Sequence, residues 1–147
     1  YLYIFGDNIE ENLGKIKFII FYLLTGGFAA LSQALLDTNS ITPMIGASGA
    51  IAGVLGAYLV LFPKAKIKVF FWFIIIFKIF KIRAFIVLGG WILMQFLSYS
   101  GDDLNSGGVA YAAHIGGFIS GIVLINFMKN KTEIKRKPSR SSVPNSK

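Results

Sequence analysis

The chain has 147 residues, of which 54% are hydrophobic and only 15% are charged, and its formal net charge is +8. Soluble domains carry about 25% charged residues. The composition therefore argues against a soluble domain, a disordered protein, a coiled coil and, despite the basic charge, a nucleic-acid-binding domain. With no cysteine and one histidine, disulfide frameworks, thiolate zinc sites and multi-histidine metal sites are excluded.

The first residues look like the end of a helix that began earlier. The chain does not start with methionine, and the apolar run Tyr1–Phe5 is too short to cross a membrane. We therefore expect a fragment that lacks an N-terminal part. Gly6, Asp7 and Asn8 carry turn signals and are expected to break this helix.

Four long stretches contain no Asp, Glu, Lys or Arg, and each is close to or longer than the roughly 20 residues that a transmembrane helix needs. In chain order they are Phe18–Leu36, Thr38–Pro63, Ala84–Gly101 and Leu104–Met128. We predict an all-α polytopic membrane protein. Residues 1–128 form its membrane domain, and residues 129–147 form a basic tail that is expected to be disordered.

The positive charges predict the orientation in the membrane. All fifteen Lys and Arg residues lie in alternate breaks between the runs, at residues 6–17, 63–83 and 129–147. By the positive-inside rule these segments, including the C-terminal tail, are cytoplasmic, and residues 37–47 and 99–108 lie on the opposite side. A soluble bundle of apolar helices would not sort its charges in this way.

Residues 67–80 are apolar and aromatic, but only nine in a row lack a charge. That is too short for a span. Lysines near both ends favour an interfacial segment on the cytoplasmic face. If the segment did cross, every later break would change sides and the sorting of charges would fail.

The second run begins with an unusual glycine pattern. At helical spacing its glycines form one narrow stripe, which lets a neighbouring helix approach closely: Gly46, Gly49, Gly53 and Gly56. On this evidence alone Ser48 is a small packing residue or a helix cap. A helix from Ser48 to Phe62 would, however, be about 22 Å long, shorter than the roughly 30 Å hydrocarbon core. The Ser48 hydroxyl would then lie recessed in the membrane beside free backbone N–H groups that can stabilise an oxyanion.

The last run contains the sole histidine, His114, on a face with Ala110, Gly117 and Gly121. A histidine inside a span is costly and suggests a function, although one interhelical hydrogen bond would also explain it. Two glycine stripes suggest that the Ser48 and His114 helices pack together, which would make a nucleophile and base. All seven acidic residues lie outside the spans, so the pair would be a dyad without a carboxylate.

Together these motifs resemble the rhomboid intramembrane serine proteases. The resemblance rests on Gly46-Ala47-Ser48-Gly49 at the start of one span and on Ala113-His114-Ile115-Gly116-Gly117 with Gly121 in another. It extends over about residues 1–128. Residues 3–11 with Gly14 resemble the segment after the second span of that family, and Gly90, Trp91 and Gln95 resemble its fifth.

The resemblance implies a six-helix core, of which this chain holds the end of the second span and the third to sixth. Ser48 would be the nucleophile and His114 the general base. Gly46 and Gly49 would support the motif and the oxyanion, and Gly53, Gly56, Gly117 and Gly121 would pack the helices. The implied activity is cleavage of transmembrane segments of membrane-protein substrates, without cofactor or metal. The implied location is a multi-pass position in a bacterial-type plasma membrane.

The sequence departs from the family pattern in two places. Family members often carry an aromatic residue four positions after the nucleophile, where this chain has Ala52, so the imidazole must be held in another way. The family's His-x-x-x-Asn motif, which supports the oxyanion, is expected to precede Tyr1. We therefore expect the 147 residues alone to be inactive.

Two other readings remain at this point. The first is a catalytically inactive rhomboid-like protein that binds membrane clients, against which the intact Ser48 and His114 argue. The second is a transporter or channel with His114 as a proton relay, but its spans lack the acidic residues that relays commonly use.

Overall fold

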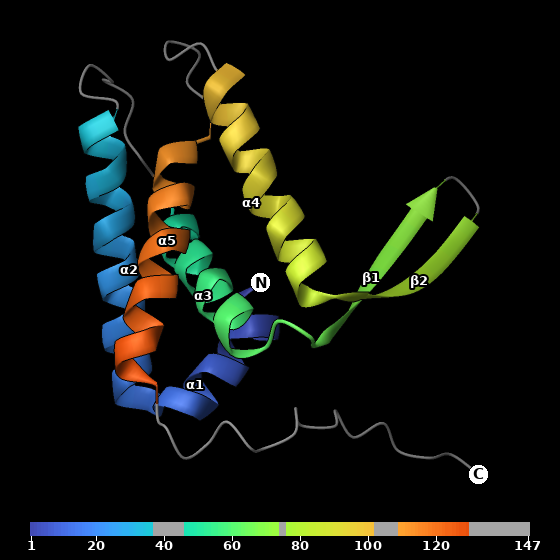
Figure 1. Ribbon diagram of the computed structural model, residues 1–147, viewed down its shortest axis with the longest axis horizontal. Helices are drawn as coiled ribbons and strands as arrows, with labels where there is room; N and C mark the ends of the chain where they lie inside the picture. Colours follow the sequence, from blue (N-terminus) through green and yellow to red (C-terminus); the bar gives the residue numbers. More distant parts are fainter. Residues whose placement is uncertain (37–45, 74–75, 102–108, 130–147) are drawn as a thin grey trace.

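The computed structural model describes residues 1–36, 46–73, 76–101 and 109–129. Four long helices lie side by side, and a β-hairpin projects from one end of the bundle (Figure 1). In chain order the elements are the π-helix η1 (Leu2–Gly6), α1 (Asp7–Leu13), α2 (Lys15–Leu36), α3 (Ser48–Leu61), β1 (Lys66–Phe73), β2 (Ile76–Arg83), α4 (Ala84–Gly101) and α5 (Tyr111–Met128).

Helix α3 forms the centre of the bundle. It contacts α2, α4, α5, η1 and α1, and nine of its 14 residues are buried. Its sequence is small and apolar on every side, as expected of a helix that is surrounded by protein. Helix α5 packs against α3 and also contacts α2 and α4, so α3 and α5 together join the other two long helices.

The outer surface of the bundle is apolar. Helix α2 exposes Ile16, Ile19, Ile20, Leu23, Leu24, Phe28, Leu31, Leu35 and Leu36. By length and composition, α2 and α5 are each able to cross a membrane, whereas α3 and α4 are apolar but shorter. Exposed apolar patches of this extent are unusual on soluble monomers, and they match the predicted helical membrane bundle.

The predicted runs correspond to the four long helices, with differences at their starts. Helices α2 and α4 cover the first and third runs. Helices α3 and α5 begin later than their runs, at Ser48 and Tyr111. The intervening residues 37–45 and 102–108, and the tail after residue 129, lie outside the described residues.

The expected break at Gly6 to Asn8 is wrong, because the chain stays helical from Leu2 to Leu13. The side-chain amide of Asn8 donates a hydrogen bond to the Ile4 carbonyl within the helix, at 3.3 Å, instead of forming a turn. The chain turns at Gly14 instead, where φ is +79° and glycine is favoured.

The segment between α3 and α4 is an antiparallel hairpin, in which Lys66 pairs with Arg83 and Phe73 with Ile76. Its Ile, Val, Phe and Trp residues favour strands. Sequence analysis predicted an all-α protein and, here, a segment that does not cross; the helical bundle agrees with the first prediction, but these two strands depart from it. The paired ends of the strands return the chain to the end of the bundle where α3 ends and α4 begins (Figure 1).

Candidate active site

Ser48 is the first residue of α3. Gly46, two residues earlier, has φ of +127°, a conformation that side chains other than glycine rarely adopt, and this turn leads the chain into the helix. The N-cap residue is Ala47, and no side chain caps this end of α3 in the described part of the chain. The Ser48 hydroxyl is therefore not used as a helix cap, and the first backbone N–H groups of α3 point outward from its N-terminus.

The start of α3 lies part-way down the bundle. Helix α3 has 14 residues and α2 has 22, and α3 begins well below the neighbouring ends of α2 and α4 (Figure 1). Ser48 itself is exposed, whereas the next residue, Gly49, is buried. The hydroxyl is thus accessible and recessed relative to the ends of the surrounding helices.

His114 lies in the first turn of α5, and its imidazole reaches Ser48. Its Nε2 is 2.9 Å from the Ser48 Oγ, although the two residues are 66 positions apart. His114 is only 9% exposed. The structure therefore brings the two residues that sequence analysis expected to form a dyad into hydrogen-bond contact.

The other imidazole nitrogen contacts α4. Nδ1 of His114 lies 2.7 Å from Oε1 of Gln95. With the Gln95 amide oxygen as the acceptor, this contact corresponds to the tautomer that carries its proton on Nδ1. In a neutral imidazole Nε2 is then unprotonated and accepts the hydrogen bond that the Ser48 hydroxyl donates.

Trp91 holds the same imidazole from the side. It lies one helical turn before Gln95, so both side chains leave the same face of α4. The Trp91 and His114 rings have centroids 5.8 Å apart at an interplanar angle of 40°. Ala52, where the family pattern often has an aromatic residue, is fully buried. Trp91 and Gln95 of α4 therefore support the imidazole in place of an aromatic residue at position 52.

Helices α3 and α5 are in backbone contact. A methyl group added to Gly117 would overlap the carbonyl oxygen of Gly49, and one added to Gly121 would overlap that of Gly53. From the opposite side, a methyl group on Gly56 would overlap the carbonyl oxygen of Phe118. Gly56, Gly117 and Gly121 thus lie in the α3–α5 interface, whereas methyl groups added to Gly49 and Gly53 would overlap Ala29 and Thr25 of α2. The close approach of α3 and α5 sets the separation of Ser48 and His114.

Comparison with known proteins identifies the family of this bundle. Residues 1–131 match the Rhomboid domain family. The chain belongs to the rhomboid family. It is also 31% identical over 144 residues to "Rhomboid protein 1, mitochondrial" of Saccharomyces cerevisiae (strain ATCC 204508 / S288c). That alignment covers 92% of this chain and 38% of the yeast protein. No solved structure matches the chain at a significant level.

Family membership confirms that this rhomboid is a membrane-embedded helical protein. The family comprises intramembrane serine proteases and inactive relatives. The yeast relative is named as a mitochondrial protein, which lends no support to the expected bacterial-type plasma membrane.

Helix α2 of this rhomboid positions the start of α5. The backbone N–H of Ala113, in the first turn of α5, donates to Oε1 of Gln33 at 3.2 Å. Gln33 therefore caps the helix end that carries His114. Below it, Ser32 lies against Gly116 and Thr25 against Gly53, where added methyl groups would overlap them.

Sequence analysis missed Gln33 and Thr25, and it noted Gln95 and Trp91 only through the resemblance. A usable signal was present, because Thr25, Gln33 and Gln95 are polar residues inside apolar runs. Polar side chains in a span need partners. The sequence does not say which partners these are.

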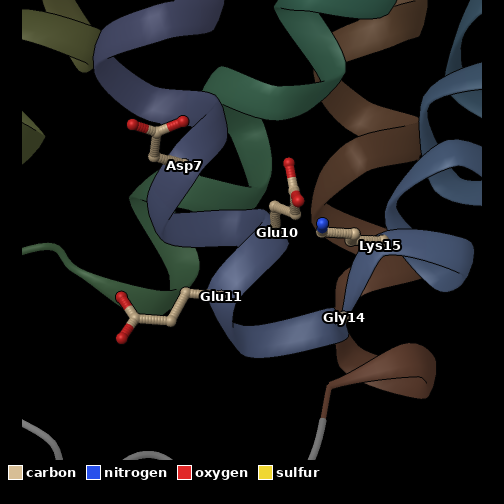
Figure 2. A pocket seen from close by; sticks show the side chains of 5 residues that line it. All are labelled: Asp7, Glu10, Glu11, Gly14 and Lys15. Carbon is tan, nitrogen blue, oxygen red and sulfur yellow. The ribbon is translucent and has the colours of Figure 1, made fainter.

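A shallow pocket of about 410 Å³ lies by α1, at the end of the bundle where α3 ends (Figure 1). It is lined by Asp7, Glu10, Glu11, Gly14 and Lys15. Glu10 and Lys15 point toward one another, whereas Glu11 points away (Figure 2). Among the described residues no group of three His, Cys, Asp or Glu side chains could hold a metal ion. The contact between Ser48 and His114 lies at the start of α3 and not here.

Proposed function

We propose that this rhomboid is an intramembrane serine endopeptidase that cleaves transmembrane segments of membrane-protein substrates. The observation that carries the proposal is the 2.9 Å contact between Ser48 Oγ and His114 Nε2 at the recessed start of α3. A serine hydroxyl in contact with an unprotonated imidazole nitrogen is an activated nucleophile.

In this mechanism Ser48 Oγ attacks the scissile carbonyl carbon while His114 Nε2 takes the hydroxyl proton. The tetrahedral intermediate collapses, the C–N bond breaks, and Nε2 gives the proton to the leaving amine. Water, deprotonated by the same nitrogen, then hydrolyses the Ser48 ester and restores the hydroxyl. No redox step or cofactor is needed.

Backbone N–H groups at the start of α3 are suited to the developing oxyanion. The amides of Ser48 and Gly49 belong to the first turn, where N–H groups have no intrahelical acceptor, and the helix dipole favours negative charge there. Gly46 permits the turn that presents them.

Gln95 acts as a positioning residue. By accepting the Nδ1 proton at 2.7 Å, it holds the tautomer in which Nε2 is a base. It also stabilises the imidazolium that forms during attack, because a hydrogen bond to a charged group is stronger than one between neutral groups. A neutral amide thus takes the place that a carboxylate has in many serine proteases.

The orientation in the membrane is also a proposal. The sorting of the basic residues supports a cytoplasmic location for the hairpin end of the bundle and for the tail. Cysteines introduced at Lys64, after α3, and at Val109, before α5, are expected to react with an impermeant maleimide from opposite sides of the membrane. Both positions are exposed. Labelling from the same side would contradict the orientation.

Cleavage of a transmembrane substrate in reconstituted vesicles tests the function. The Ser48→Ala and His114→Ala variants should each reduce cleavage to background, and the double variant should add nothing, because the two residues act as a unit. Asp102→Asn and Asp103→Asn, which lie outside the described residues, are matched controls that should retain most activity. Full activity of Ser48→Ala would overturn the proposal, and an inert wild-type protein would favour the client-binding alternative.

A further inference from the structure

The base of the hairpin carries four positive charges on one face. Side chains alternate between the two faces of a strand, so Lys66 and Lys68 project to the same side of β1. The register places Arg83 directly opposite Lys66 and Lys81 directly opposite Lys68. All four residues are exposed. We call Lys66, Lys68, Lys81 and Arg83 the basic ladder.

Like charges directly opposite one another destabilise a sheet, and here two such pairs follow each other along the strands. The neighbouring sequence supplies no compensating charge, since residues 38–101 contain no Asp or Glu. The carboxylates among the described residues are those of Asp7, Glu10 and Glu11, which line the pocket by α1. An anion from outside the chain would remove the repulsion.

The surroundings of the basic ladder are apolar. Ile67, between the two lysines of β1, packs against the hydrophobic core. Ile79 and Phe80 of β2 are 62% and 41% exposed, and Phe85 and Ile86 at the start of α4 are exposed as well. Basic residues beside exposed apolar ones are typical of surfaces that lie in a membrane interface.

The hairpin is also fixed in position relative to the bundle. The backbone N–H of Ala84 donates to the Ala65 carbonyl at 2.7 Å, and that of Phe85 to the Pro63 carbonyl at 3.2 Å. From this base the strands project sideways past α4 (Figure 1). The base of the hairpin, which carries the basic residues, lies at the end of the bundle where α3 ends and α4 begins, and this end of a membrane bundle is at the level of the lipid headgroups.

We propose that the basic ladder is a binding site for the headgroup of an anionic phospholipid. Side chains directly opposite in an antiparallel pair have Cβ atoms about 4.5–5.5 Å apart. One phosphate group can therefore accept hydrogen bonds from Lys68 and Lys81 together, while the acyl chains lie along the exposed apolar residues of β2 and α4. This site is remote from Ser48 and does not depend on the proposed proteolysis.

Native mass spectrometry of the protein, expressed from its complete reading frame and purified in detergent, tests the site. Phosphatidylglycerol and phosphatidylcholine are titrated separately, and the apparent Kd of the first bound lipid is measured. In the test variant Lys68→Gln/Lys81→Gln, affinity for phosphatidylglycerol should fall by about 5- to 25-fold, since one basic residue near an anionic surface contributes about fivefold. Affinity for phosphatidylcholine should not change.

Two matched variants sharpen the result. Lys64→Gln/Lys129→Gln removes the same charge at the same end of the bundle but outside the basic ladder, and should weaken binding by less than about twofold. Lys68→Arg/Lys81→Arg keeps the charge and should bind as the wild type does. Equal losses in both Gln variants would overturn the proposal. So would equal wild-type affinity for the two lipids, an outcome that would favour an acidic protein partner for the basic ladder.

Discussion

Helix α5 meets its neighbours α3 and α4 in two different ways. Against α3 the contact is between backbones, and methyl groups on Gly117 or Gly121 would overlap carbonyl oxygens of α3. Against α4, by contrast, side chains make contact, those of Gln95 and Trp91 with His114 and that of Trp91 with Phe118, and methyl groups added to Gly89 or Gly90 of α4 would enter open space. Yet α4 makes the contacts that orient the imidazole. The α3–α5 interface thus sets the distance between Ser48 and His114, and α4 sets the orientation of the ring.

Because of this difference, we expect changes at the two contacts to affect stability and activity differently. Helix α4 exposes Leu93, Met94, Phe96 and Leu97. It contacts His114 through the side chains of Gln95 and Trp91. Changes at the α3–α5 interface should therefore lower stability and activity together. Changes on the His114-facing side of α4 should lower activity and leave the bundle folded.

The largest effect is expected at the backbone contact. Gly117→Ala and Gly121→Ala force a methyl group into a carbonyl oxygen of α3, so the helices must separate. Overpacking of this kind costs about 1–3 kcal/mol, and the shift also lengthens the contact between Ser48 and His114. Thermal unfolding in detergent and substrate cleavage should both show the loss. Wild-type stability of Gly121→Ala would contradict the close contact.

An intermediate effect is expected at Gln95. Gln95→Leu removes the acceptor for Nδ1, and a hydrogen bond to a charged group is worth about 1.5–3 kcal/mol. The turnover number should therefore fall by about 10- to 150-fold while KM and the unfolding temperature stay close to those of the wild type. Gln95→Glu keeps an oxygen acceptor at this position and should retain more activity than Gln95→Leu. A rise in KM with an unchanged turnover number would indicate that Gln95 contacts the substrate instead.

The smallest effect is expected at the open glycines of α4. Gly89→Ala and Gly90→Ala add a methyl group where there is space, and alanine is favoured over glycine in a helix by about 0.5–1 kcal/mol. Both variants should retain activity and unfold at the same or a slightly higher temperature. They are matched controls for Gly117→Ala and Gly121→Ala, and equal damage in all four variants would show that the loss does not depend on the close contact between α3 and α5.

Several parts of the fold follow from local sequence. Run length and the absence of charge predict the four long helices, and Pro63 together with the glycine motif predicts the limits of α3 to within a few residues. The chemistry of residues 67–80 excludes a span, but a short run of Ile, Val, Phe and Trp fits a strand as well as an interfacial helix. The hairpin therefore depends on pairing that the sequence pattern does not specify.

The site shows a similar limit. Glycine stripes on two helices predict that Ser48 and His114 meet, because only glycine allows such close approach. Gln33 and Gln95 are single polar residues in apolar helices, and their partners depend on how the helices rotate against one another. The prediction of a break at Gly6 to Asn8 was wrong because packing outweighed local preference. These residues favour turns in isolation, but burial of Ile9 and Leu13 stabilises the helix that contains Asn8.

The most direct test of the proposed chemistry is labelling of Ser48 by a fluorophosphonate, in the protein expressed from its complete reading frame and kept in its membrane. The wild type should form one covalent adduct, and peptide mapping should place it on Ser48. Ser48→Ala should abolish labelling, and His114→Ala should slow it severely because the hydroxyl loses its base, whereas Gly89→Ala should label as the wild type does. A wild-type protein that does not react, or one that reacts equally well without His114, would contradict the account.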